Sequence, residues 1–121
     1  MDIFLNIIQG VLGLAFLAAG GMKAAQSKEQ LAGNMAWVED FSDMQVRLIG
    51  IAEVLGGLAL ILSIFITSPT ALLLGGIAAI CLAILMGGAA YTHIRRGEMN
   101  QVTPGVVLGI LSLIMAYTLL I

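Results

Sequence analysis

The chain has 121 residues, of which 60% are hydrophobic and 10% are charged, and its mean hydropathy is +1.09. Soluble domains are about 45–50% apolar and about 25% charged, so this composition excludes an ordinary soluble protein and indicates an integral membrane protein. The net charge is −2 and no basic stripe is present, so nothing supports nucleic-acid binding.

The first expected helix comprises residues 3–22, an uncharged apolar stretch of the roughly 20 residues that a helix needs to cross about 30 Å of hydrocarbon. No Lys/Arg cluster precedes it, so it is expected to stay in the mature protein rather than to act as a cleaved signal. At about 100° per residue, one arc of this helix gathers its amides, several small residues and a cation. This arc should face the protein interior, and its members are Asn6, Gln9, Gly13, Phe16, Gly20 and Lys23.

The connection that follows, 24–42, has features of a segment at the lipid surface. Ser27 precedes Gln30 by three residues, which is the spacing of a helix capping box, and a partly apolar stretch follows. A short interfacial helix anchored by Trp37 is therefore expected. The alternative is a solvated loop with an incidental tryptophan.

The second expected helix, 43–66, begins at a capping box formed by Ser42 and Gln45. Glu53 is the single charge between residues 48 and 66. A carboxylate within a membrane span costs about 2.5–3.5 kcal/mol on insertion scales, so it is expected to face the bundle interior and to have a partner. Glu53 is therefore the first candidate for a functional residue.

The third and fourth expected helices, 69–96 and 103–121, start at Ser68-Pro69 and Thr103-Pro104, where a hydroxyl residue precedes proline. This arrangement supplies a side-chain cap and then a residue whose missing amide hydrogen is not needed in the first turn. Gly97 follows two arginines and suits the end of the third helix. Small residues recur at every fourth position and should make this helix central to the packing: Ala71, Gly75, Ala79, Ala83 and Gly87.

Two of the three connections are short, so consecutive helices should be antiparallel neighbours. The expected fold is all-α, a single domain over 1–121 formed by an up-down-up-down four-helix transmembrane bundle. All five Lys and Arg residues lie in the loops 23–47 and 92–101. The positive-inside rule then predicts that both loops are cytoplasmic and that both termini are outside.

Glu53 should lie roughly 8–9 Å inside the cytoplasmic end of its helix. Arg47 is six residues earlier and off the face of Glu53, so Lys23 or His93 from a neighbouring helix is the better partner, with Lys23 favoured. One interpretation is a polar pocket that holds the head group of a small amphipathic molecule and moves protons. The other is an internal ion pair that only fixes helix register. The candidate ligand-binding or proton-relay residues are Glu53, Lys23, Arg47, His93, Gln9 and Trp37.

No metal-ligand spacing, phosphate-binding glycine loop or serine-histidine-acid set appears in the sequence, so no metal site is predicted and catalysis is left open. Cys81 has no second thiol for a dithiol cycle. A single histidine cannot supply both axial ligands of a bis-histidine haem. No cofactor is therefore expected in the isolated chain.

Residues 34–42 and 46–57 resemble the DoxX-like family of small bacterial membrane proteins, most clearly in Arg47-Leu48-Ile49-Gly50-Ile51-Ala52-Glu53. Residues 88–98 and Gly20-Gly21-Met22-Lys23 extend the resemblance over nearly the whole chain. It implies a four-helix protein of the bacterial cytoplasmic (inner) membrane. The family name comes from a subunit of a thiosulfate:quinone oxidoreductase, and relatives have been tied to oxidative-stress complexes and respiratory redox chemistry.

By this resemblance the expected function is to bind a quinone-like or other small lipid-soluble molecule near Glu53, as an accessory subunit beside a redox partner protein. Quinone is then the candidate cofactor, and membrane lipid is a partner in any case. A proton-coupled small-molecule carrier is one alternative, although four helices are few unless the chain forms a homo-oligomer. A structural or assembly factor without a ligand is the other.

Overall fold

The computed structural model describes residues 3–26 and 41–121. This part of the chain contains no strand and four long helices, with one short 3₁₀ turn, η2, before the last of them. The elements are α1 (Ile3–Ala25), α3 (Asp43–Phe65), α4 (Pro69–Arg95), η2 (Met99–Gln101) and α5 (Val102–Leu120). The predicted bounds agree with these to within three residues.

Each of the four helices is long and apolar enough to cross a membrane, with 19 to 27 residues. Most of their large apolar side chains are exposed on the outer faces of the bundle, including Val11, Leu55 and Leu113. Such an apolar outer surface is suited to contact with lipid, whose hydrocarbon core offers no water to hydrogen-bond with polar groups. The predicted class, an all-α protein with four membrane-spanning helices, is confirmed.

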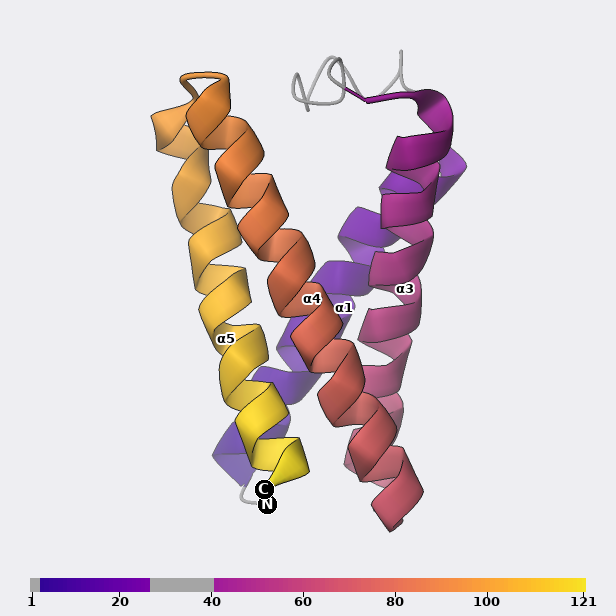
Figure 1. Cartoon of the computed structure of the whole chain (residues 1–121). Coiled ribbons are helices and arrows are strands. Elements are labelled where there is room, and N and C mark those ends of the chain that lie inside the picture. The colour runs from indigo at the N-terminus through magenta and orange to yellow at the C-terminus, as the bar shows by residue number, and fades with distance from the viewer. Residues whose placement is uncertain (1–2, 27–40) are drawn as a thin grey trace.

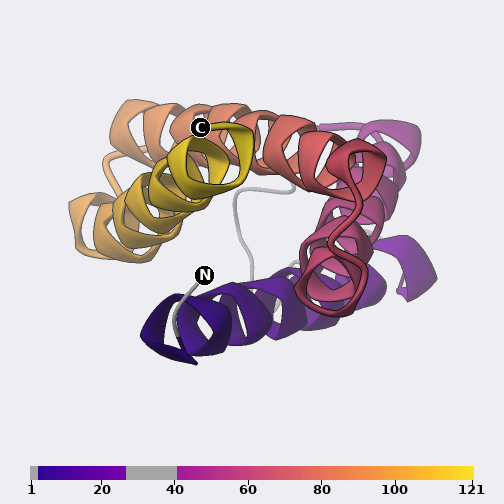
Figure 2. The same cartoon turned by 90° about the horizontal axis from the view of Figure 1, so that it is seen from below.

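The helices form two antiparallel hairpins. α1 packs along α3, α4 packs along α5, and contact between α3 and α4 joins the two hairpins (Figure 1). Seen from below, the four helices follow an arc in chain order, with α1 and α5 at its two ends (Figure 2). The start of α1 and the end of α5 lie at the end of the bundle opposite η2. The two hairpins converge at that end and diverge toward η2.

The starts of α3 and α4 follow the predicted capping chemistry. The amide of Gln45 donates to Ser42 Oγ at 3.1 Å, and the Ser42 amide donates to Gln45 Oε1 at 3.0 Å, which completes the capping box. At α4, Ser68 Oγ accepts a hydrogen bond from the amide of Ala71, and proline occupies the first turn. These local bonds satisfy amides that a helix start otherwise leaves without a partner.

The junction between α4 and α5 differs in one respect from its prediction. Gly97 follows α4 with φ of 73°, the left-handed conformation expected there. However, α5 begins at Val102, so Thr103 lies inside the first turn and is not the cap. The reason is that η2 runs directly into the helix, and the Val102 amide donates to the carbonyl oxygen of Met99. Pro104 still lies in the first turn, where its missing amide hydrogen costs little.

The inward arc predicted for α1 is confirmed except at one end: Gln9, Gly13, Phe16, Gly20 and Lys23 are buried, whereas Asn6 is partly exposed. The central core draws on all four helices and consists of Leu12, Phe16, Leu60, Ala79, Leu82, Met86, Met115, Ala116 and Leu119. The small-residue row of α4 packs only in part. Gly75 and Ala79 are buried, whereas Gly87 is exposed and has open space around it.

Part of the predicted connection 24–42 lies outside the described residues. This applies to the Ser27–Gln30 capping box, to the short interfacial helix and to its anchor Trp37. At the near end of the connection, α1 continues to Ala25, three residues beyond the predicted end of the first helix.

Candidate functional site

Glu53 and Lys23 form a buried ion pair between α1 and α3. Lys23 lies in the last turn of α1, and its Nζ donates a hydrogen bond to Glu53 Oε1 at 2.5 Å. Glu53 is 1% exposed and Lys23 is 8% exposed. Lys23 is therefore the partner of Glu53 in the structure, as expected from the sequence. Hydrogen bonds between oppositely charged groups are among the stronger side-chain contacts in proteins.

The local sequence explains why the two side chains meet. One turn before Lys23 and Glu53, the helices carry Gly20 and Gly50, and both glycines are buried. A side chain at either glycine would collide with the backbone of the other helix. The absence of side chains therefore allows α1 and α3 to approach closely, and the ion pair follows on the same face three residues later.

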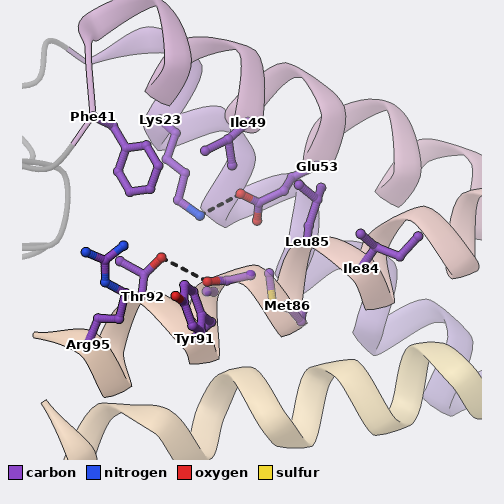
Figure 3. Close-up of a pocket in the computed structure, with 12 residues that line it drawn as sticks. Lys23, Phe41, Ile49, Glu53, Ile84, Leu85, Met86, Tyr91, Thr92 and Arg95 are labelled. Carbon is purple, nitrogen blue, oxygen red and sulfur yellow. Dashed lines mark hydrogen bonds and ion pairs between the residues drawn. The ribbon is translucent and has the colours of Figure 1, made fainter. Parts of the chain in front are cut away.

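The ion pair faces a cavity of about 660 Å³ between the two hairpins (Figure 3). The first hairpin and Phe41, which lies two residues before α3, contribute one wall, and α4 contributes the other. The first wall contains Phe41, Ile49 and the Lys23–Glu53 pair. The α4 wall includes Ile84, Leu85, Met86, Tyr91, Thr92 and Arg95.

Polarity changes along this cavity. Ile84, Leu85 and Met86 line the part toward the middle of α4, while Thr92 and Arg95 line the part at its last turn. Figure 3 shows Arg95 and Ile84 at opposite ends of the cavity, with the ion pair between them. Binding sites for small molecules commonly combine mostly apolar walls with a few placed polar groups. This cavity has that character and would suit an amphipathic occupant.

Arg95 contributes an exposed cation to the cavity. Its guanidinium carbon lies 5.8 Å from the centre of the Tyr91 ring, within the range of a cation–π contact. Among the described residues, no carboxylate forms a salt bridge with Arg95. Tyr91 and Arg95 are four residues apart and therefore neighbours on one face of α4.

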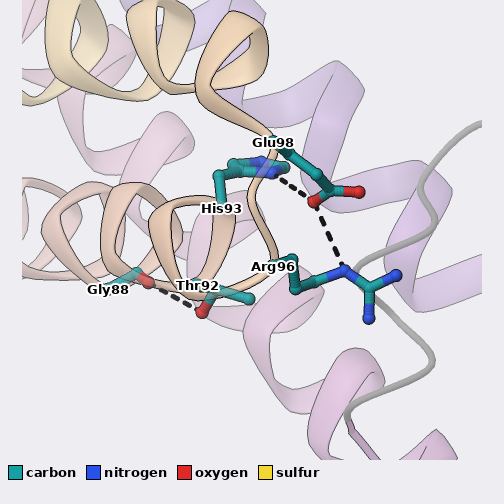
Figure 4. A network of polar contacts seen from close by, with 5 residues as sticks. All are labelled: Gly88, Thr92, His93, Arg96 and Glu98. Carbon is teal, nitrogen blue, oxygen red and sulfur yellow. Dashed lines mark hydrogen bonds and ion pairs between the residues drawn. The ribbon is translucent and has the colours of Figure 1, made fainter.

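His93 does not join the Glu53 site, contrary to the sequence-based expectation. Its Nδ1 lies 3.0 Å from Glu98 Oε1, and Arg96 Nε lies 3.3 Å from the same oxygen (Figure 4). The pKa of Glu98 is held below its ordinary value, mainly by the hydrogen bond with His93 and further by the charge of Arg96. The reason for the difference is the left-handed turn at Gly97, which folds Glu98 back toward the end of α4.

Two further candidates also lie outside the cavity. Arg47 is exposed on α3, because six residues of helix rotate it away from the buried face of Glu53. Gln9 is fully buried, but its Nε2 donates to Leu60 O and Ser63 Oγ, each at 2.7 Å, nearer the opposite end of the bundle. The prediction that Arg47 and Gln9 share a site with Glu53 is therefore corrected: neither side chain lines the cavity. Trp37 is outside the described residues.

Reasoning from the sequence missed Phe41, Tyr91, Thr92 and Arg95 as cavity residues. One signal was present: Ile84, Gly88, Tyr91, Thr92 and Arg95 recur at spacings of one, three and four residues, which place them on one helical face. What the spacing does not show is which helix this face meets.

The described residues contain no group of three or more His, Cys, Asp or Glu side chains that could hold a metal ion. Cys81 is exposed on the surface of α4. The charged groups that the described residues contribute to the cavity are instead Lys23, Glu53 and Arg95, which can bind and orient polar atoms of a ligand.

Comparison with known proteins identifies a matching family. The sequence model of the DoxX-like family matches residues 7–115, which is most of the chain. No curated protein and no solved structure matches the chain. The matched region includes Lys23, Glu53 and the whole α4 wall of the cavity. The chain belongs to the DoxX-like family of proteins.

Proposed function

We propose that this protein binds a quinone-like or other small lipid-soluble molecule in the cavity beside Glu53, as an accessory subunit of a redox system. The observation that carries the proposal is that the buried Lys23–Glu53 pair lines an open cavity of about 660 Å³. If the pair only aligned two helices, close packing around it would be the more stable arrangement. Ligand pockets, by contrast, typically measure about 300–1,000 Å³ and are mostly apolar with a few polar groups.

The residues of the cavity fit a quinone-like ring. Phe41 and Tyr91 offer aromatic surfaces, and apolar side chains such as Met86 surround the space. Quinone carbonyl oxygens accept hydrogen bonds, and Lys23 and Arg95 carry donors on the cavity wall. The bound quinone would supply the redox chemistry, and a soluble partner protein would exchange electrons with it. The residues of this chain would hold and orient the ring.

The test is binding of decylubiquinone to the purified protein in mild detergent, combined with native mass spectrometry for a retained ligand. Glu53→Gln removes the charge that holds Lys23 and should weaken binding by about tenfold. Gln9→Met is the matched control, because Gln9 is also buried between α1 and α3 but lies outside the cavity. Equal binding by the wild type and Glu53→Gln would contradict the proposal, as would the absence of any binding.

The proposal extends to location and orientation. All five Lys and Arg residues lie in the two loops at the cavity end of the bundle or next to them, which favours a cytoplasmic position for that end in the bacterial inner membrane. The cavity would then open toward the cytoplasmic leaflet. A reporter that fluoresces only in the cytoplasm should be bright when inserted at residue 99 and dark when fused after residue 121. The reverse pattern would overturn this orientation.

A structural or assembly role is the second candidate, and the glycine contact favours it. Gly20 and Gly50 pack backbone against backbone one turn from the ion pair, so the pair can form only when α1 and α3 are packed together. In this case, Glu53→Gln would lower thermal stability and the yield of any complex without altering a binding curve. The quinone titration above therefore separates the two functions.

A carrier would need a larger rearrangement. A second cavity of about 520 Å³ lies toward the opposite end of the bundle, lined by residues that include Asn6, Ser63 and Thr118. Between the two cavities, Phe16, Leu60 and Leu82 form an apolar layer in which each side chain is at most 1% exposed. Transport would require this layer to open, and flux in proteoliposomes that depends on pH and on Glu53 would reveal it.

A further inference from the structure

The cavity has more positive than negative charge on its described walls. Lys23 and Arg95 are the cations and Glu53 is the anion, so one positive charge is left over. Glu53 Oε1 is engaged with Lys23 at 2.5 Å, and the carboxylate is almost fully buried. It is therefore committed to Lys23 and does not neutralise Arg95. The excess charge lies at the end of the cavity formed by the last turn of α4.

Arg95 is suited to an anionic partner. Its guanidinium rests near the Tyr91 ring, which restricts the side chain but leaves the forked N–H donors free of any carboxylate among the described residues. A guanidinium binds a planar oxyanion through two parallel hydrogen bonds, and such charge-assisted bonds are about twice as strong as neutral ones. Away from Arg95, the cavity becomes apolar toward Ile84 and Met86.

We propose that the ligand of this cavity is an acidic amphiphile with one oxyanion head group, such as a carboxylate, bound by Arg95, and with an apolar body directed toward Ile84 and Met86. This inference rests on the proposed ligand-binding function. Among the lipid-soluble molecules proposed there, it selects those with a single negative charge over a neutral quinone. The size of the cavity, about 660 Å³, is that of a site for a drug-sized molecule.

The test compares two fluorescent probes that differ only in the head group: dansyl-labelled undecanoic acid and the corresponding alcohol. Both are titrated at pH 7 into the full-length protein in a neutral detergent. The wild type should bind the acid about tenfold more tightly than the alcohol, as expected for one charge-assisted hydrogen-bonded contact. Arg95→Gln should bring the two affinities within about twofold of each other, mainly by weakening binding of the acid.

Two further variants make the comparison specific. Arg95→Lys keeps the charge but loses the planar fork, so it should retain only part of the preference for the acid. Arg47→Gln removes the same charge from an exposed position outside the cavity and should keep the full preference. A similar loss of preference in Arg47→Gln would show that overall charge, and not the cavity, attracts the acid, and would overturn the inference.

The outcomes also separate this inference from the function on which it rests. If the wild type binds both probes equally well, the cavity binds amphiphiles but the head-group assignment is wrong. If neither probe binds to any variant, this inference fails, and the decylubiquinone titration decides separately whether the proposed function also fails. The thermal transition of Arg95→Gln shows whether this variant is folded. If it is folded and still prefers the acid as strongly as the wild type, the role of Arg95 is overturned.

The oxyanion could belong to a free amphiphile or to a membrane lipid, and the same assay distinguishes these sources. The titration is repeated in nanodiscs of phosphatidylcholine alone and of phosphatidylcholine with phosphatidylglycerol. Competition by the anionic lipid in the wild type, but not in Arg95→Gln, assigns the head group to lipid. Unchanged affinity for the acid probe in both nanodiscs assigns it to a free amphiphile.

Discussion

Gly20 and Gly50 bring the backbones of α1 and α3 into direct contact. A Cβ atom at Gly20 would lie 2.5 Å from the carbonyl oxygen of Gly50, and a Cβ atom at Gly50 would lie 2.6 Å from the carbonyl oxygen of Gly20. Lys23 and Glu53 follow these two glycines at the same interval of three residues. The glycine contact therefore sets the separation of the two helices that the ion pair bridges.

Gly20→Ala should destabilise the protein because its methyl group meets backbone atoms that cannot rotate away. Overpacking of this kind costs about 1–3 kcal/mol. The matched control is Gly21→Ala, since a Cβ atom at Gly21 has no neighbour within 4 Å. Thermal unfolding in detergent should show a lower Tm for Gly20→Ala and an unchanged or higher Tm for Gly21→Ala. Equal Tm values for the two variants would show that the close approach of α1 and α3 is not as described.

The Lys23–Glu53 pair should behave as a unit in a double-mutant cycle. Lys23→Met leaves a buried carboxylate without its cation, and loss of one partner of a buried pair costs about 3–5 kcal/mol. Adding Glu53→Gln to this variant removes the unpaired charge and should restore part of the lost stability. Denaturation of the wild type, both single variants and the double variant measures the coupling. Strictly additive losses would mean that the two side chains do not interact.

Glu98 should make the protein sensitive to acid at the end of α4. Its pKa is lowered from 4.5 in the folded protein, mainly by the hydrogen bond with His93. A lowered pKa contributes stability above the unfolded value, and this contribution is lost as the pH falls through the folded value. The Tm of the wild type should therefore fall more steeply below pH 4.5 than the Tm of Glu98→Gln. Parallel Tm curves for the two proteins would contradict a stabilising role of the carboxylate.

Gly97 should resist substitution because of its backbone conformation. Its φ of 73° lies in the left-handed region, where residues with a Cβ atom are disfavoured by about 1–2 kcal/mol. Gly97→Ala should therefore lower the free energy of unfolding by about 1 kcal/mol and weaken the contact of His93 with Glu98. Gly87→Ala is the control, since Gly87 is helical and has open space around it. A destabilisation of the same size in Gly87→Ala would argue against the backbone explanation.

Much of the fold was predictable because it depends on local properties of the chain. Helix lengths follow from runs of apolar residues, and helix starts follow from capping residues such as Ser42 and Ser68, whose partners are only three residues away. The inward face of α1 also followed from its periodicity. The start of α5 is predicted less well, because η2 runs directly into the helix and places Thr103 inside its first turn.

The sequence by itself determined that the chain spans a membrane with four helices and that Glu53 needs a cation from another helix, because the cost of an unpaired charge in lipid leaves few alternatives. Only the tertiary structure decided which residues share the cavity. The positions of Arg95 and Tyr91 opposite the ion pair, of His93 against Glu98 and of Gln9 against Ser63 depend on how each helix is rotated and on how the two hairpins diverge. Contacts between residues far apart in the chain set these angles, and no local pattern encodes them.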